Sequence, residues 1–142
     1  MKVSQNFFIE EFVPPEIWER FGNNAIWFIN PKIILINQFI RERFKVEVTV
    51  NNWKDLGQYK ESGFRMPETK TGARLSQHKL GNASDTKVEG FTAEEVRNDI
   101  RKNFDLYSKF GLSTIEKDTD TWTHIDCRAT GLDHLFEVNI PK

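Results

Sequence analysis

The sequence predicts an α+β domain that contains two helices and several short strands. Apolar residues recur at helical spacing in two segments, 31–44 and 93–110, which indicates an amphipathic helix in each. Apolar and polar residues alternate over 46–50, which is the period of a half-buried strand. Further strands are expected at 122–128 and 135–140, on either side of a turn. The two kinds of periodicity in one chain favour the mixed fold class.

The first main helix is preceded by an arm rich in aromatic residues. Phe and Trp are frequent over 4–28, and a short helix is expected over 16–21, with Pro15 at its first position. The remainder of this arm is expected to pack its aromatic side chains across the domain. Asn30 followed by Pro31 is typical of a helix N-cap and first helical residue, which places the start of the 31–44 helix.

The second main helix follows a long polar region. Residues 54–71 contain glycines and a proline and are expected to form loops with short extended pieces. Thr92 and Glu95 have the spacing of a capping box, in which each side chain bonds an otherwise unpaired backbone N–H group. Gly111 stands where a left-handed C-cap is expected. These signals predict a helix over 93–110.

Length and composition limit the classes of protein that the chain can belong to. A chain of 142 residues is expected to form a single domain spanning 1–142. The 20 basic and 21 acidic residues form no basic stripe, which argues against a nucleic-acid partner. No apolar run approaches the roughly 20 residues that cross a bilayer, and the first residues lack the apolar core of a signal peptide. We therefore expect a cytoplasmic monomer without membrane contact. A single cysteine excludes an internal disulfide.

Two stretches of the chain carry residues suited to metal binding. His78 is followed seven residues later by Asp85, and His124 lies about forty residues beyond. Two histidines and one carboxylate are the minimal protein set for zinc with one open position. Gly81 favours a tight turn between the first two residues rather than a continuous helix. Histidines and aspartates in strands and turns more often have structural roles, so the spacing alone leaves both interpretations open.

The first stretch resembles the signature of the zinc D-Ala-D-Ala carboxypeptidase and L-alanyl-D-glutamate endopeptidase family, which includes many phage endolysins. The matching positions are Ser76, His78, Gly81, Ala83 and Asp85, followed by Trp122 and His124. The segment 62–65 is similar to the Ser-Gly-Tyr-Arg segment of that family, and the resemblance extends over residues 4–128. It implies the hedgehog/DD-peptidase fold, in which two main helices pack against a small antiparallel sheet.

The resemblance also implies a function and a set of site residues. His78, Asp85 and His124 would bind Zn²⁺, while Arg65 and Ser76 would contact the substrate. The implied activity is a zinc metallopeptidase in which a zinc-activated water hydrolyses a peptide bond of peptidoglycan stem peptides, as a D,D-carboxypeptidase or an endopeptidase. The substrate would be reached from the cytoplasm through a phage lysis system.

One position departs from the pattern of this family. The family usually has a catalytic Glu three residues before the last histidine, and Thr121 stands there in this chain. Asp120 and Asp126 are the nearest carboxylates, and both stay open as general base, with Asp120 favoured because it lies closest to the usual side of the metal. Glu116 and Asp118 lie farther away in a predicted acidic loop over 116–120.

The same departure leaves a second function open. A domain of this fold can keep its zinc ligands without being a peptidase, and the missing base is the feature that favours such an interpretation. The alternative is therefore a catalytically inactive zinc-binding module used for recognition or as a structural part.

Overall fold

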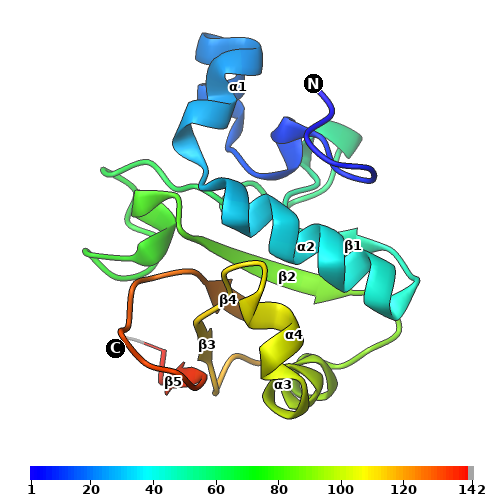
Figure 1. Ribbon diagram of the computed structural model, residues 1–142. Helices are drawn as coiled ribbons and strands as arrows, with labels where there is room; N and C mark the ends of the chain where they lie inside the picture. The colour runs from blue at the N-terminus through cyan, green and yellow to red at the C-terminus, as the bar shows by residue number, and fades with distance from the viewer. Residues whose placement is uncertain (141–142) are drawn as a thin grey trace.

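A five-stranded mixed sheet lies at the centre of the computed structural model, which describes residues 1–140 (Figure 1). The strands, in their order across the sheet, are β1 (Val48–Thr49), β2 (Ala83–Val88), β4 (Thr123–Asp126), β3 (Thr114–Glu116) and β5 (Phe136–Val138). All neighbouring pairs are antiparallel except β3 and β5, which are parallel. The α+β class is confirmed, whereas the expectation of a purely antiparallel sheet is wrong for this last pair.

Four α-helices and four short 3₁₀ helices accompany the sheet. The α-helices are α1 (Pro15–Phe21), α2 (Pro31–Phe44), α3 (Ala93–Lys102) and α4 (Phe104–Ser108). The 3₁₀ helices are η1 (Ile9–Glu11), η2 (Gly22–Phe28), η3 (Trp53–Asp55) and η4 (Gln77–Leu80). Figure 1 shows α2 lying along β2, with α1 at one end of the molecule and α3 and α4 at the other. None of the helices in the described part of the chain is long and apolar enough to cross a membrane.

The structure confirms the predicted starts of the main helices and corrects one continuation. The Asn30 side chain accepts a hydrogen bond from the Lys32 backbone N–H group, as expected of an N-cap. The predicted 93–110 helix is interrupted at Asn103, which separates α3 from α4. The side-chain amide of Asn103 donates to the Asp99 carbonyl oxygen, so it competes with the backbone for that acceptor and favours a break.

The expected strands exist but are shorter than predicted. The alternating segment 46–50 contributes only the two residues of β1, and 122–128 and 135–140 contribute β4 and β5. Strand length depends on the partner strand as well as on alternation, and β1 pairs with just the last two residues of β2.

A buried polar network fixes β2 against α2. Asn37 of α2 is fully buried, and its amide nitrogen donates to the Ile33 carbonyl oxygen and to Ser84 Oγ, both at 2.9 Å. Thr86 Oγ1 donates to Asn37 Oδ1 at 2.8 Å. Because side chains alternate along a strand, Ser84 and Thr86 face α2 while Asp85 faces the opposite side. The network therefore sets the position of the strand that presents Asp85.

Replacing Asn37 should destabilise the protein, because the Ser84 and Thr86 hydroxyls would each lose a hydrogen bond to the Asn37 amide in a dry environment and would keep only the bond between them. We expect Asn37→Ala to lower the free energy of unfolding by about 2–3 kcal/mol, measured by urea denaturation. Leu35→Ala, on the exposed face of the same helix, is the control and should change it by less than about 1 kcal/mol. Equal losses in the two variants would show that the network contributes nothing specific.

Candidate metal centre

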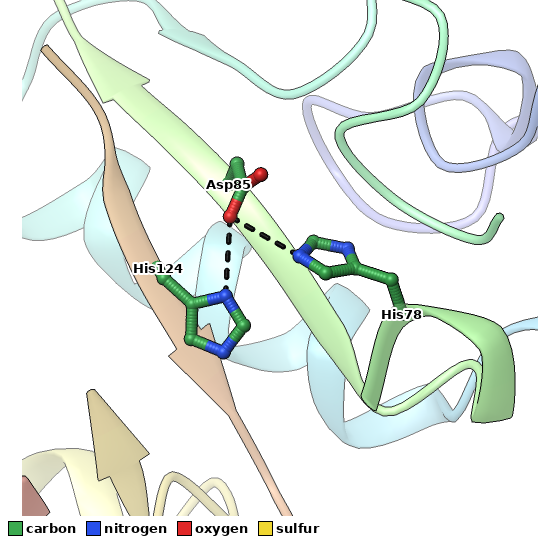
Figure 2. Close-up of side chains that lie close together, drawn as sticks. All are labelled: His78, Asp85 and His124. Carbon is green, nitrogen blue, oxygen red and sulfur yellow. Dashed lines mark hydrogen bonds and ion pairs between the residues drawn. The ribbon is translucent and has the colours of Figure 1, made fainter. Parts of the chain in front are cut away.

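Three buried side chains from separate elements converge on one point. His78 comes from η4, Asp85 from β2 and His124 from β4 (Figure 2). Asp85 Oδ1 lies 3.2 Å from His78 Nε2 and 3.1 Å from His124 Nδ1. The three potential ligand atoms all lie within 4.8 Å of one another. Each histidine is 2% exposed and Asp85 is 9% exposed. The arrangement is compatible with a metal site.

Strand pairing and a single helical turn produce this convergence. The register of β2 and β4 places Asp85 directly opposite His124. Ser76 Oγ accepts a hydrogen bond from the His78 N–H group and so begins the turn. Gly81 ends it at φ +73°, and a Cβ atom there would lie 2.3 Å from the Phe28 carbonyl oxygen. Glycine is therefore required at this position, and the predicted turn between His78 and Asp85 is confirmed.

Each histidine is oriented by a hydrogen bond on the ring nitrogen that faces away from this point. His78 Nδ1 lies 2.8 Å from the Gly63 carbonyl oxygen, which can only accept, so Nδ1 carries the proton and Nε2 presents its lone pair. His124 Nε2 lies 2.9 Å from Asp126 Oδ2, which leaves Nδ1 as the ligand atom. Metal-binding histidines almost always have such an outer partner. The outer contacts therefore fit a metal site as well as the ligand atoms do.

Arg65 gives the carboxylate ligand a corresponding outer contact. Its Nη2 donates to Asp85 Oδ2 at 2.9 Å, on the oxygen that does not face the histidines. Its Nε donates to the Glu61 carbonyl oxygen at 2.7 Å, which fixes the guanidinium plane. A Cβ atom on Gly72 would lie 2.4 Å from Arg65 Nη1, so this end of the guanidinium lies against the loop at Gly72. The predicted contact of Arg65 with substrate stays a prediction, and the structure adds the bond to Asp85.

Burial and mutual charge set the ionisation of the three residues in the metal-free protein. Burial lowers the pKa of His78 and favours its neutral form. Burial alone would raise the pKa of Asp85, but the neighbouring imidazoles outweigh it and hold that pKa well below its usual range. Burial would likewise lower the pKa of His124, yet hydrogen bonds to Asp126 and Asp85 raise it to about 9. An ionised carboxylate and a neutral imidazole are the forms that bind a metal.

The two carboxylates proposed from the sequence as general base lie in very different places. Asp126 is 0% exposed and bonds to His124 Nε2 and to Arg128, on the side of the ring away from the ligand atoms. Asp120 is exposed in the loop between β3 and β4 and does not line the cleft at the metal centre. Asp118 of the same loop accepts a hydrogen bond from the Ile140 N–H group.

Glu116 is an acidic residue near the candidate centre that the sequence places in an acidic loop. In the structure it is the last residue of β3, beside β4. Its Oε1 lies 3.6 Å from His124 Nδ1, the ligand atom, and its side chain is 14% exposed. Burial raises its pKa above the ordinary value for glutamate. The pairing of Ile115 with Ile125 brings Glu116 toward His124, and that pairing was not visible in the spacing along the chain.

The metal centre lies at the base of a cleft of about 270 Å³. Its rim carries polar and apolar side chains, among them Arg65, Ser76, Glu116, Arg128, Leu75, Trp122 and Ile140. Ser76, predicted to bind substrate, therefore lines the cleft, and its hydroxyl also accepts the bond that begins η4. A larger cavity, of about 530 Å³, lies between the N-terminal arm and β1 and contains none of the predicted site residues. His134 is exposed and pairs with Asp133, outside the cleft.

Comparisons with protein-family models, with curated proteins and with solved structures found no match to this chain.

The geometry predicts that the purified protein binds one divalent metal ion per chain. His78→Ala removes one of three ligands and should abolish this stoichiometric binding, measured by elemental mass spectrometry after dialysis in chelator-free buffer. His134→Ala is the matched control, because this third histidine is exposed and should leave the metal content unchanged. Metal retained at full occupancy by His78→Ala would refute the site.

Proposed function

We propose that this protein is a zinc-dependent peptidase that hydrolyses a peptide bond in peptidoglycan stem peptides. The proposal is carried by one observation, the convergence of His78, Asp85 and His124 at the base of a cleft with Glu116 beside them. Two imidazole nitrogens and one carboxylate oxygen suit zinc and leave a coordination position open. When bound, zinc would lower the pKa of a water molecule toward about 7 and polarise a substrate carbonyl. The substrate class rests on the resemblance of residues 76–85 to the zinc D-Ala-D-Ala carboxypeptidase family.

Glu116 is the residue proposed to move the proton. Its carboxylate Oε1 is 3.6 Å from a ligand atom of the candidate metal centre and lines the same cleft. Because this carboxylate lies beside a ligand atom of the candidate centre, Glu116 would be the general base for the water that zinc activates. Glu116 then accepts the proton of the attacking water at Oε1 and delivers it to the leaving amine. The general base would thus come from β3, whereas in the family that this chain resembles it comes three residues before the last histidine.

Two further residues of the cleft are proposed to hold the substrate. Arg65 lines the cleft with its Nη2 bound to Asp85, and its guanidinium would donate to the substrate carbonyl and stabilise the negative charge that develops on that oxygen. Ser76 Oγ accepts a bond from the His78 N–H group, so its own hydrogen remains available for a substrate oxygen. Asp126 has no contact with the substrate in this mechanism, because it is buried behind His124.

An inactive zinc-binding module is the second candidate, and Thr121 in place of the usual base is the observation that favours it. The two functions differ in one respect that can be measured. A peptidase requires Glu116 for turnover and does not require it for zinc binding. An inactive module binds zinc and releases no peptide product.

Digestion of muropeptides by the zinc-loaded protein tests the proposed function. We expect product release that stops with a chelator, and a fall in kcat of about 100-fold or more for Glu116→Gln, because a general base contributes 10²–10⁴-fold. The zinc content of this variant should stay at that of the wild type. Products would be followed by liquid chromatography with mass spectrometry.

Asp120→Asn is the matched control, since it makes the same chemical change at an exposed carboxylate outside the cleft. It should retain wild-type kcat. A large loss in Asp120→Asn with none in Glu116→Gln would return the base to Asp120. Stoichiometric zinc without turnover on any muropeptide would identify the inactive module.

A further inference from the structure

Arg128 lines the cleft of the candidate metal centre, yet no motif position accounts for it. Its Nε donates to Asp126 Oδ1 at 2.9 Å and its Nη2 donates to Asp126 Oδ2, so the guanidinium is held by a two-point contact. Asp126 is fully buried and also bonds to His124. A fixed partner of this kind makes the guanidinium rigid, and the side chain, which lines the cleft, is 27% exposed.

One end of this guanidinium remains free to bind a ligand. Arg128 Nη1 donates to no acceptor among residues 1–140, and this nitrogen is not fully buried. Its hydrogens are therefore open to solvent in the cleft. Arg65 differs, because its Nη2 is bound to Asp85, a candidate metal ligand, and its Nη1 lies against Gly72. The cleft thus has two guanidinium groups at different distances from the metal position.

The charges around the cleft favour an anionic group at the Arg128 end. With a divalent ion bound and both imidazoles neutral, the ion and the two guanidinium groups exceed the carboxylates of Asp85, Asp126 and Glu116 by one positive charge. Arg128 is held by Asp126 on the Nε2 side of His124, whereas Glu116 approaches Nδ1 of the same ring. Guanidinium groups bind carboxylates in preference to neutral oxygens.

We propose that Arg128 forms a carboxylate-binding subsite, so that the substrate is a peptide with a free carboxylate a few residues from the bond that is cut. The inference rests on the proposed peptidase function and specifies its substrate class. An extended peptide advances about 3.3–3.6 Å per residue. A peptide that is cut at the metal position can therefore extend past the His124 ring and the Asp126 carboxylate and place a terminal or side-chain carboxylate at Arg128. Arg65 binds the carbonyl that reacts, and Arg128 binds the anion that selects the peptide.

The test compares two probes that differ only in charge. One is the pentapeptide L-Ala-D-Glu-L-Lys-D-Ala-D-Ala, and the other is the same peptide with both carboxylates converted to carboxamides. Affinity for the zinc-loaded and metal-free proteins is measured by calorimetry, and turnover of both probes is measured separately. We expect the wild type to bind the carboxylate peptide at least about tenfold more tightly in both forms.

Arg128→Gln should remove this preference and leave the affinity for the amidated peptide unchanged. If Arg128 acted only by holding Asp126 and His124, both peptides would be weakened equally, which would overturn the proposal. Arg74→Gln is the matched control, because Arg74 is exposed next to the cleft without lining it, and this variant should keep the preference.

The outcomes separate this inference from the proposed function. Equal affinity of the wild type for both peptides, or binding of neither, overturns the Arg128 subsite even if zinc-dependent cleavage is observed. A carboxylate preference that depends on Arg128 supports the subsite even if no peptide is cleaved, in which case the hydrolytic function fails alone.

Discussion

The position of one carboxylate, Asp85, organises this protein. A carboxylate that is 9% exposed is costly to bury unless charges and hydrogen bonds compensate for the lost hydration. Here Oδ1 faces two imidazoles and Oδ2 accepts a bond from Arg65. The strand that carries Asp85 is fixed on its other face by the Asn37 network. Removing any one of these contacts would leave a buried charge with fewer partners, so the strand, the turn at η4 and the Arg65 loop depend on one another.

Three carboxylates around one histidine show how environment separates chemically similar groups. Asp85 and Glu116 both approach His124 Nδ1, at 3.1 and 3.6 Å, while Asp126 bonds to Nε2 on the opposite side. Burial is offset by imidazole neighbours at Asp85 and by His124 and Arg128 at Asp126, and both pKa values are lowered. Burial dominates at Glu116, which has the opposite shift. Environment alone therefore gives three carboxylates that share one histidine neighbour different pKa shifts.

The sequence predicted the features of this protein that depend on local chemistry. The cap at Asn30, the turn that ends at Gly81 and the strand that carries His124 each follow from a few adjacent residues. Glu116 could not be placed in this way, because its closeness to His124 depends on the pairing of β3 with β4. The parallel pairing of β5 and the break at Asn103 also depend on contacts outside the local pattern. Glu116, which belongs to no motif, thus lies beside the candidate metal centre because of strand pairing and not because of its position along the chain.

The short parallel strand β5 also affects how the cleft is completed. Ile140, just beyond this strand, forms part of the rim, and its N–H group is held by Asp118. The strand has three residues and lies at the edge of the sheet, with the two residues Phe136 and Glu137 exposed. Edge segments with little buried surface open at a lower free energy than the core. Local opening of this edge would move Ile140 away from the cleft rim while Asp85 and both histidines remain in place, so access to the centre and integrity of the centre are separate properties of the fold.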